Sequence, residues 1–208
     1  RVVGGSPAEA TGKVLLEDPH DSFSLIHLML QAQGKASTNA AEVMTADDGQ
    51  VVHDFLKPYV ESSHLRGFTG NAYLQDFASG DTWCAFVWSG DLASSGGEDD
   101  RFIFPEEGSM IATDNMMIPK GAQHKYTAEL MMDWVYDVQR AARLANFIYY
   151  ISPVKGVADA IKALDEAAAS NPLLFPPPDV VAKQHPQPTW DDATEAKINE
   201  LYADLTGV

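Results

Sequence analysis

Short runs of hydrophobic residues, broken by Gly, Pro and acidic residues, divide the chain into alternating segments. Apolar runs predict strands at residues 13–16, 65–68, 83–88, 102–104 and 110–118. Apolar positions that recur on one face predict helices at residues 22–33, 37–45, 50–61, 71–79, 126–136, 138–147, 156–169 and 191–205. Because strands and helices alternate, we expect an α/β fold with a mainly parallel sheet flanked by helices.

The composition supports a folded protein and excludes one class of partner. With 45% hydrophobic residues among 208, the chain can bury a core as one large domain or two small ones. Its 30 acidic residues outnumber 14 basic ones, which gives a net charge of −16. Nucleic acid binding depends on Lys and Arg, so we expect no nucleic acid partner. An acidic field attracts cations, but it equally suits solubility in a salty or acidic habitat.

The sequence contains few patterns that indicate a cellular location. Cys84 is the only cysteine, so no intrachain disulfide is expected, and its apolar neighbours indicate a core residue. No apolar run approaches the ~20 residues that span a bilayer. The opening segment RVVGGSPAEATGK has no signal-peptide pattern, and a mature secreted protein would look the same.

The motifs of common cofactor and metal sites do not occur in the sequence. The histidines lie apart and form no HxH or HExxH motif, at positions 20, 27, 53, 64, 124 and 185. There is no GxGxxG, GxxxxGK[ST] or GxSxG motif. We therefore expect no metal, no cofactor and no enzymatic activity. A glycoside hydrolase with paired carboxylates is the enzyme alternative, because such enzymes also use Asp, Glu and Trp.

Carboxylates and aromatic residues near strand ends could hold an organic cation, through charge-assisted hydrogen bonds and cation–π attraction. Asp18 and Asp21 precede the first helix, where they either face a cleft or cap that helix. Trp88 ends an apolar strand and is either a core residue or a cleft wall. Asp114 is expected inside the strand 110–118, where an ionised carboxylate is rarely buried without a partner.

Two further segments carry polar or aromatic groups. Ser89-Gly90-Asp91 is interpreted as a strand-to-helix turn, with Asp91 as the helix cap. Of the neighbours Tyr149 and Tyr150, one is expected to pack inward and the other to present its ring and hydroxyl to a ligand.

The order and spacing of seven segments resemble bacterial spermidine/putrescine-binding proteins, the periplasmic or lipid-anchored binding components of ABC importers. Nearly the whole chain from Gly12 is covered, by GKVLLEDPHDSF, GNAYLQDFASGD, FVWSGD, FIFPEEGSM, TDNMMIPKGA, YISPVKG and LFPPPD. The resemblance implies a type II periplasmic-binding-protein-like fold, in which two lobes close on the ligand. It implies that residues 1–109 and 150–208 form the second lobe. Residues 110–149 would be a hinge-crossing segment, normally packed in the first lobe.

The same resemblance implies a set of ligand-binding residues. The acidic residues before the last helix would meet ammonium groups, the aromatic ones would line the methylene chain, and Thr69 and Asp191 would add polar contacts. The set is Asp18, Asp21, Thr69, Trp88, Asp114, Tyr150 and Asp191. One departure is Ala112, where the family often has an aromatic residue, and this either leaves room for a bulkier ligand or weakens the binding of a linear polyamine.

The function implied by the resemblance is that of a substrate-binding protein for polyamines or a related cationic amine. Its partner would be an ABC permease, and it would be periplasmic or extracellular, held at the membrane by the transporter or a lipid anchor. Family members are usually longer, so the alternative is an incomplete receptor lobe without ligand binding of its own. A homodimer is expected through the apolar face that a first lobe would cover, made of Met116, Met117, Leu130, Met131, Trp134 and Val135.

Overall fold

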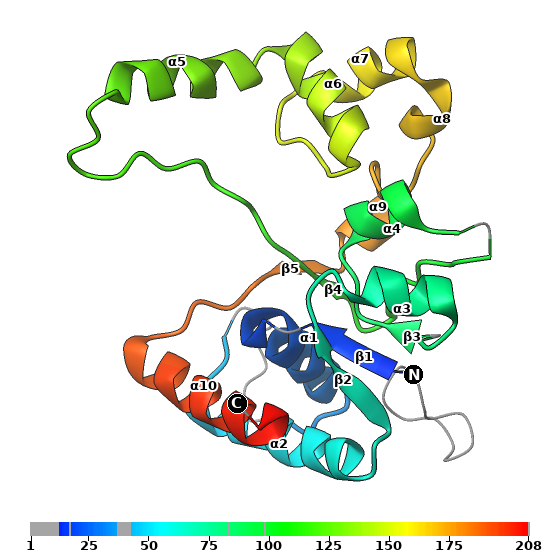
Figure 1. Cartoon of the computed structure of the whole chain (residues 1–208), viewed down its shortest axis with the longest axis vertical. Coiled ribbons are helices and arrows are strands. Elements are labelled where there is room, and N and C mark those ends of the chain that lie inside the picture. Colours follow the sequence, from blue (N-terminus) through cyan, green and yellow to red (C-terminus); the bar gives the residue numbers. More distant parts are fainter. Residues whose placement is uncertain (1–12, 17, 37–42, 83, 98, 208) are drawn as a thin grey trace. The chain divides into compact units, whose positions relative to one another are not determined.

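The structure is a computed structural model that describes residues 13–16, 18–36, 43–82, 84–97 and 99–207 (Figure 1). The chain divides into two compact units. Unit 1 comprises Arg1–Val87, Gly97–Ala112 and Ala182–Val208, and unit 2 comprises Trp88–Gly96 and Thr113–Val181. The assignment of residues 1–109, 150–208 and 110–149 to lobes of a larger receptor stays a prediction.

The sheet of unit 1 is parallel, as the alternation of elements predicted. Its strands are β1 (Lys13–Leu16), β2 (Leu65–Thr69) and β3 (Cys84–Ala85), in the order β2-β1-β3. Both neighbours run parallel to β1, and Leu16 pairs with Thr69 at the carboxyl ends. The segments after β1 and β2 therefore start at the same edge of the sheet, the edge that carries ligand sites in open α/β folds.

The helices of unit 1 begin at residues that satisfy their first backbone N–H groups. These helices are α1 (Pro19–Ala32), α2 (Ala46–Glu61), α3 (Tyr73–Ser79) and α10 (Asp192–Thr206). The Asp18 carboxylate caps α1, which continues with a proline suited to the first turn. Thr45 and Asp48 form a capping box at α2. The helix predicted at 37–45 lies mostly outside the described residues, and residues 43–45 are not helical.

The core of unit 1 lies where α1, α2 and α10 meet. Gly49 of α2 allows this approach, because a Cβ there would lie 2.9 Å from Cγ1 of Ile198 on α10. The buried residues are mostly large and apolar, namely Phe23, Ile26, Leu30, Met44, Val52, Leu56, Leu65, Ile198, Leu201 and Leu205. The amphipathic patterns of these helices thus face one another, as the helix periodicity predicted.

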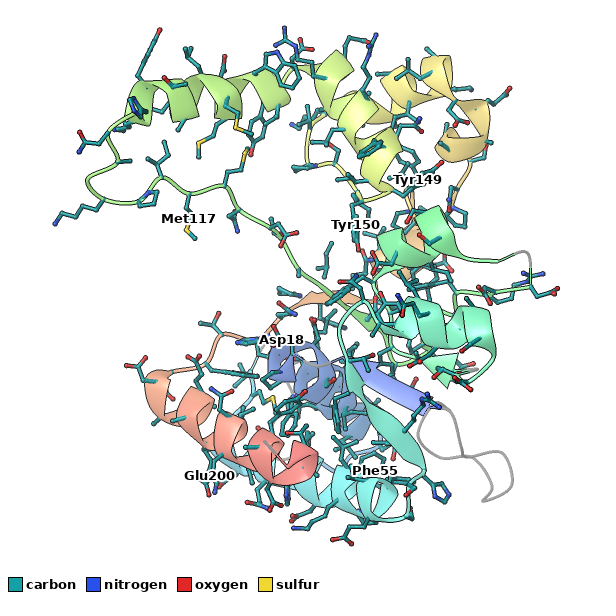
Figure 2. The ribbon with its side chains drawn as sticks, viewed as in Figure 1. Asp18, Phe55, Met117, Tyr149, Tyr150 and Glu200 are labelled. Carbon is teal, nitrogen blue, oxygen red and sulfur yellow. The ribbon has the colours of Figure 1, made fainter. Side chains whose placement is uncertain are left out.

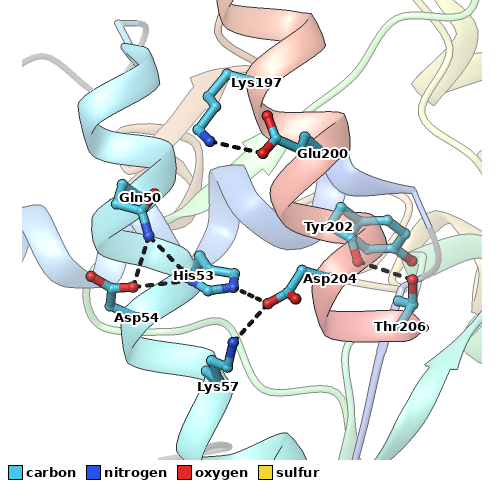
Figure 3. Close-up of polar contacts among 9 residues, drawn as sticks. All are labelled: Gln50, His53, Asp54, Lys57, Lys197, Glu200, Tyr202, Asp204 and Thr206. Carbon is cyan, nitrogen blue, oxygen red and sulfur yellow. Dashed lines mark hydrogen bonds and ion pairs between the residues drawn. The ribbon is translucent and has the colours of Figure 1, made fainter. Parts of the chain in front are cut away.

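A polar cluster at the edge of this core also connects α2 with α10 (Figure 3). The buried His53 ring lies 3.0 Å from Asp54 Oδ1 through Nδ1 and 2.8 Å from Asp204 Oδ2 through Nε2. Lys57 Nζ lies 2.8 Å from the same Asp204 oxygen. Hydrogen bonds from Lys57 and His53 lower the pKa of the Asp204 carboxyl. The cluster ties together residues far apart in the sequence.

Three predicted strands are wrong or too long, and the one predicted at 83–88 is only β3 among the described residues. Residues 102–104 are irregular, and the strand predicted at 110–118 is only β4 (Ser109–Ile111), paired in parallel with β5 (Gln184–Pro186). A strand needs a neighbour for its backbone hydrogen bonds, and β5 ends at a proline, which lacks an N–H group. Phe102 and Phe104 alternate with the 79% exposed Ile103, which explains why their pattern resembles a strand.

The regular secondary structure in the described part of unit 2 consists of helices, joined by irregular segments such as residues 113–124. Its helices are α4 (Ser89–Ser95), α5 (Lys125–Val135), α6 (Val138–Ile148), α7 (Val157–Leu164), α8 (Glu166–Ala169) and α9 (Pro178–Val181). The single helix predicted at 156–169 is divided into α7 and α8. Asp165 stands between them in extended conformation and accepts a hydrogen bond from Ala168 N at 3.0 Å. An aspartate favours a helix start over a helix interior, which explains the division.

The core of unit 2 is small, and one of its helices has no buried residue. The buried set consists mostly of alanines, namely Ala141, Ala142, Ala145, Val157, Ala160, Ile161, Ala168 and Leu174. No residue of α5 is buried, and α6 is the neighbour at its end (Figure 1). Of the apolar face predicted from the sequence, Met117 is 84% exposed (Figure 2) and Val135 is half-buried.

Candidate ligand-binding site

A tyrosine–carboxylate contact stands out in unit 2. The Tyr150 hydroxyl donates a hydrogen bond to Asp91 Oδ1 at 3.2 Å. Its ring lies against Gly90 of α4, since any Cβ at that glycine would overlap the ring. Just before it, Tyr149 ends α6 in the left-handed conformation, at φ 58° and ψ 29°, and its N–H donates to Ala145 O. Figure 2 labels both tyrosines where the chain leaves α6.

The charges of two carboxylates act on the Tyr150 phenol. Burial, the charge of Asp91 and the charge of Asp114 together raise the pKa of this phenol above its ordinary value. The two carboxylates therefore both act on the Tyr150 phenol, which stays protonated at neutral pH. Asp91, Asp114 and Tyr150 form a cluster of hydrogen-bond acceptors that suits a cation, which we call the Tyr150 cluster.

The environment of Asp114 corrects one step of the sequence reasoning. Asp114 was expected in a strand interior, but β4 ends at Ile111 and Asp114 is exposed. Its carboxylate therefore needs no buried partner. Trp88 is half-buried and lies directly before α4. The sequence left open whether it is a core residue or a cleft wall, and a half-buried ring is compatible with both roles.

Asp91 was missed by the sequence analysis. It does not cap α4, because Trp88 occupies the cap position and Asp91 lies within the first helical turn. Its Oδ1 instead accepts a hydrogen bond from the Tyr150 hydroxyl. The signal in the sequence was the Trp-Ser-Gly-Asp segment, in which a glycine beside the carboxylate leaves space for an aromatic ring.

Four predicted site residues belong to unit 1, and the starts of α1 and α10 bring three of them close to one another. Asp18 accepts a hydrogen bond from the His20 N–H at 2.8 Å and thereby caps α1, which is one of the two roles that the sequence left open. Asp21 Oδ1 accepts a bond from Gln187 Nε2 at 2.5 Å. Gln187 belongs to the segment that leads into α10, so both carboxylates lie near that segment.

Aromatic stacking adds a second contact at the same place. The His20 ring stacks on Trp190, with ring centroids 3.7 Å apart and an angle of 16° between the planes. Asp191 follows and caps α10, accepting from Thr194 N at 2.8 Å. Hydrogen bonds from the Thr194 backbone and side chain lower the pKa of Asp191. This carboxylate thus has a structural role, and its ligand contact stays a prediction.

Thr69 is the fourth predicted residue of unit 1. It lies at the carboxyl end of β2, in register with the last residue of β1. Its Oγ1 is buried and has no hydrogen-bond partner among the described residues. A buried hydroxyl without a partner is costly, so this atom could serve a ligand.

The histidines and other metal-ligating side chains offer no metal centre in the part of the chain that the structure describes, since no three of them lie together. Several histidines have structural contacts instead, such as His53 between two aspartates and His20 on an indole ring.

Comparison with known proteins establishes the family. Residues 7–177 match the profile of the bacterial extracellular solute-binding proteins. The chain belongs to this family. Its members bind solutes for transport and are not enzymes, which agrees with the expectation of a binding protein. The family resemblance inferred from the sequence is thereby confirmed.

Similar proteins are named for polyamines. The putrescine-binding periplasmic protein PotF of Escherichia coli is 27% identical over 58% of this chain and 34% of its own length. A putrescine/cadaverine-binding protein of Pseudomonas aeruginosa is 23% identical over 92% of this chain and 53% of its own length. The chain thus spans about half the length of the Pseudomonas aeruginosa relative and about a third of the length of PotF.

A solved structure shows the fold. The spermidine/putrescine ABC transporter substrate-binding protein PotD of Streptococcus pneumoniae superposes with a TM-score of 0.72 at 16% identity, over 95% of this chain and 58% of its own. The type II periplasmic-binding-protein fold predicted from the sequence is therefore confirmed.

No helix in the described residues has the length and apolar character needed to cross a membrane.

Proposed function

We propose that this solute-binding protein takes polyamines, such as putrescine or spermidine, or a related cationic amine, for import by an ABC transporter. Its direct partner would be the membrane permease. Its place would be the periplasm or the cell exterior, at the membrane through the transporter or a lipid anchor. The names of the relatives support the ligand class, since both are named for putrescine.

The observation that carries the proposal is the Tyr150 cluster. The Tyr150 hydroxyl donates to Asp91, and the charges of Asp91 and Asp114 both act on this phenol in unit 2. An ammonium group has three N–H donors and a positive charge, so it can satisfy several acceptors at once. Trp88, three residues before Asp91, offers a half-buried ring for the methylene chain or for cation–π attraction.

Unit 1 supports the proposal with a second group of acceptors. Asp18 and Asp21 lie at the start of α1, beside the carboxyl end of the parallel sheet. Thr69 adds a buried hydroxyl without a partner in the described structure. We propose that these side chains contact the ligand too, with Asp191 as a polar contact.

The test is calorimetry of the chain with putrescine and spermidine, with glutamate as an anionic control. Replacing Asp91 or Asp114 by Asn should weaken amine binding at least about tenfold, or about 1.4 kcal/mol. The matched control is Asp159→Asn, an exposed aspartate of α7 in the same unit, which should leave affinity unchanged. Equal affinities for all three variants would contradict the assignment of the cluster.

Variants of lesser effect separate the remaining roles. Trp88→Ala should weaken binding less than the carboxylate variants, because stacking and cation–π contacts are worth about 1 kcal/mol at partly exposed sites. Asp18→Asn should change the preference between putrescine and spermidine. An unchanged preference would remove Asp18 from the site.

The alternative is an incomplete receptor lobe without ligand binding of its own. In that case no amine gives heat with the wild-type chain. The glycoside hydrolase alternative has no support from a family of solute-binding proteins.

We also propose a homodimer through the exposed apolar side chains of unit 2. Met117 is 84% exposed, and Leu130, Met131 and Trp134 of α5 are exposed as well. An apolar surface of this kind favours association. Sedimentation velocity across micromolar concentrations should show a dimer, and a monomer throughout that range would disprove it.

A further inference from the structure

The hydroxyl of Tyr150 can donate one hydrogen bond, and in the structure the acceptor is Asp91. The O–H group donates to Asp91 Oδ1 at 3.2 Å. A phenol has one donor and keeps acceptor lone pairs on the same oxygen. Because its O–H group donates to Asp91, the phenol oxygen can only accept from any further group. Tyr150 is 36% exposed, so it is partly accessible to a ligand.

Two neighbouring backbone features fix this arrangement. Gly90 provides the surface on which the Tyr150 ring lies, and a Cβ at this position would overlap three atoms of the ring. Tyr149 turns the chain out of α6 in the left-handed region, at φ 58°. A non-glycine residue pays conformational energy for this region, and such residues concentrate at functional sites. In the described chain Ser63 is the other non-glycine residue with positive φ.

We propose that Gly90 and Tyr149 are positioning residues that keep the Tyr150 hydroxyl donating to Asp91, and that the cluster therefore selects cations bearing N–H donors over quaternary ammonium ions. The selectivity part rests on the proposed function. The positioning part concerns the protein without ligand.

The selectivity follows from counting donors and acceptors. The groups of the cluster, the carboxylates of Asp91 and Asp114 and the Tyr150 oxygen, are all acceptors towards a ligand. A primary ammonium brings three donors. A quaternary ammonium brings the same charge without a donor, so it would remove water from these acceptors and leave them unsatisfied. Cation–π attraction to Trp88 would serve both kinds of cation and does not distinguish them.

The first experiment compares ligands by calorimetry. Wild-type protein should bind putrescine at least about tenfold more tightly than its hexamethylated, doubly quaternary analogue, since the lost hydrogen bonds involve charged groups. N,N′-diisopropylputrescine serves as the control for size, because it is bulky and keeps two N–H donors on each nitrogen. It should bind more tightly than the quaternary analogue. Equal affinity for these two bulky ligands would overturn the selectivity.

The second experiment uses matched variants of the positioning residues. Gly90→Ala should displace the ring and reduce the preference for N–H-bearing ligands. Its control is Gly67→Ala, because a Cβ at Gly67 would meet nothing within 4 Å. Tyr149→Gly keeps the left-handed conformation accessible and should keep the preference, whereas Tyr149→Val opposes that conformation and should lose it. Circular dichroism identifies any variant that fails to fold.

The third measurement needs no ligand and reports on the proton itself. The ultraviolet titration of wild type minus that of Tyr150→Phe isolates the Tyr150 phenol. This phenol should ionise at higher pH than an ordinary tyrosine, whose pKa is about 10. In Gly90→Ala and Tyr149→Val its ionisation should return towards the ordinary value, while Tyr149→Gly should resemble wild type.

These outcomes separate the two claims. An unchanged Tyr150 titration in folded Gly90→Ala and Tyr149→Val would overturn the positioning. If wild type binds no amine but the titrations behave as expected, the proposed function fails and the positioning of the Tyr150 proton is supported.

Discussion

The cores of the two units differ in the size of the side chains that fill them. Unit 1 buries phenylalanine, leucine, isoleucine and valine side chains between α1, α2 and α10. Unit 2 buries mainly alanines, whereas large side chains such as Met117, Trp134 and the 81% exposed Phe147 stay at its surface. Unit 1 thus has a core of ordinary kind, and unit 2 keeps much of its apolar surface outside its core.

The difference indicates where stability resides. Burial of apolar area is the main favourable contribution to folding, and a buried alanine contributes little of it. The helix α5 buries no residue, although the guanidinium of Arg140 lies over the Trp134 ring at 4.7 Å. We therefore expect unit 2 to depend more on association, with a second copy or another partner, than unit 1 does.

The largest effect is expected in the core of unit 1. Phe23 is fully buried, and Phe23→Ala should lower the free energy of unfolding by about 3–5 kcal/mol, because it leaves a cavity. Phe147→Ala on the exposed side of α6 is the matched control and should change it by less than about 0.5 kcal/mol. Urea denaturation measures both. Similar losses would mean that the surface of unit 2 is covered in solution.

A smaller effect is expected from overfilling the alanine core of unit 2. Ala142 of α6 is fully buried, and Ala142→Leu should cost about 1–3 kcal/mol if the helices pack tightly there. Urea denaturation followed by circular dichroism is the measurement. An unchanged or higher stability would show that this core has unfilled space.

The buried histidine of unit 1 should make stability depend on pH. His27 lies 3.4 Å from Asp48, and burial lowers the pKa of His27 below 6.5, although Asp48 opposes this. The folded protein thus keeps His27 neutral where the unfolded chain binds a proton. Stability is full only well above pH 6.5 and falls as the pH drops through this value, by at most about 1.4 kcal/mol for each pH unit. His27→Gln should remove this part of the slope between about pH 7.5 and 5.5, and an identical slope would contradict it.

The smallest effect on stability is expected on α5. Leu130 and Met131 are exposed, and replacing both by Gln, a good helix former, should change the free energy of unfolding by less than about 0.5 kcal/mol. The same change should reduce self-association in sedimentation velocity. A large loss of stability in dilute protein would show that α5 packs on other residues of the chain.

Helix positions could be predicted well from the sequence because their signals are local. Asp18 and Asp191 stand directly before the helices that they start, whereas Thr45, predicted as the end of a helix at 37–45, caps α2. Strands were less predictable, since residues 102–104 have the apolar alternation of a strand but no pairing in the structure. A strand depends on a partner that can lie anywhere in the sequence.

The site shows the same limit. Asp91 and Tyr150 are 59 positions apart, and no spacing rule connects them. Asp114 could be selected as a site residue from the sequence, but the expectation of a buried strand position was wrong. Whether Asp114 is exposed depends on where β4 loses its partner strand. Gly90 beside Asp91 is a local signal, yet its meaning becomes clear only with a ring placed against it.

The contact between His53 and Asp204 also bears on how the protein is made. These residues are 151 positions apart, and Asp204 belongs to the helix that covers the core of unit 1. At typical rates of about 5–20 residues per second, a ribosome needs roughly 8–30 s to reach α10 after α2. During that time the apolar faces of α1 and α2 lack a main partner. A nascent chain at this stage is a natural substrate for chaperones, and unit 1 completes its folding only after α10 has been synthesised.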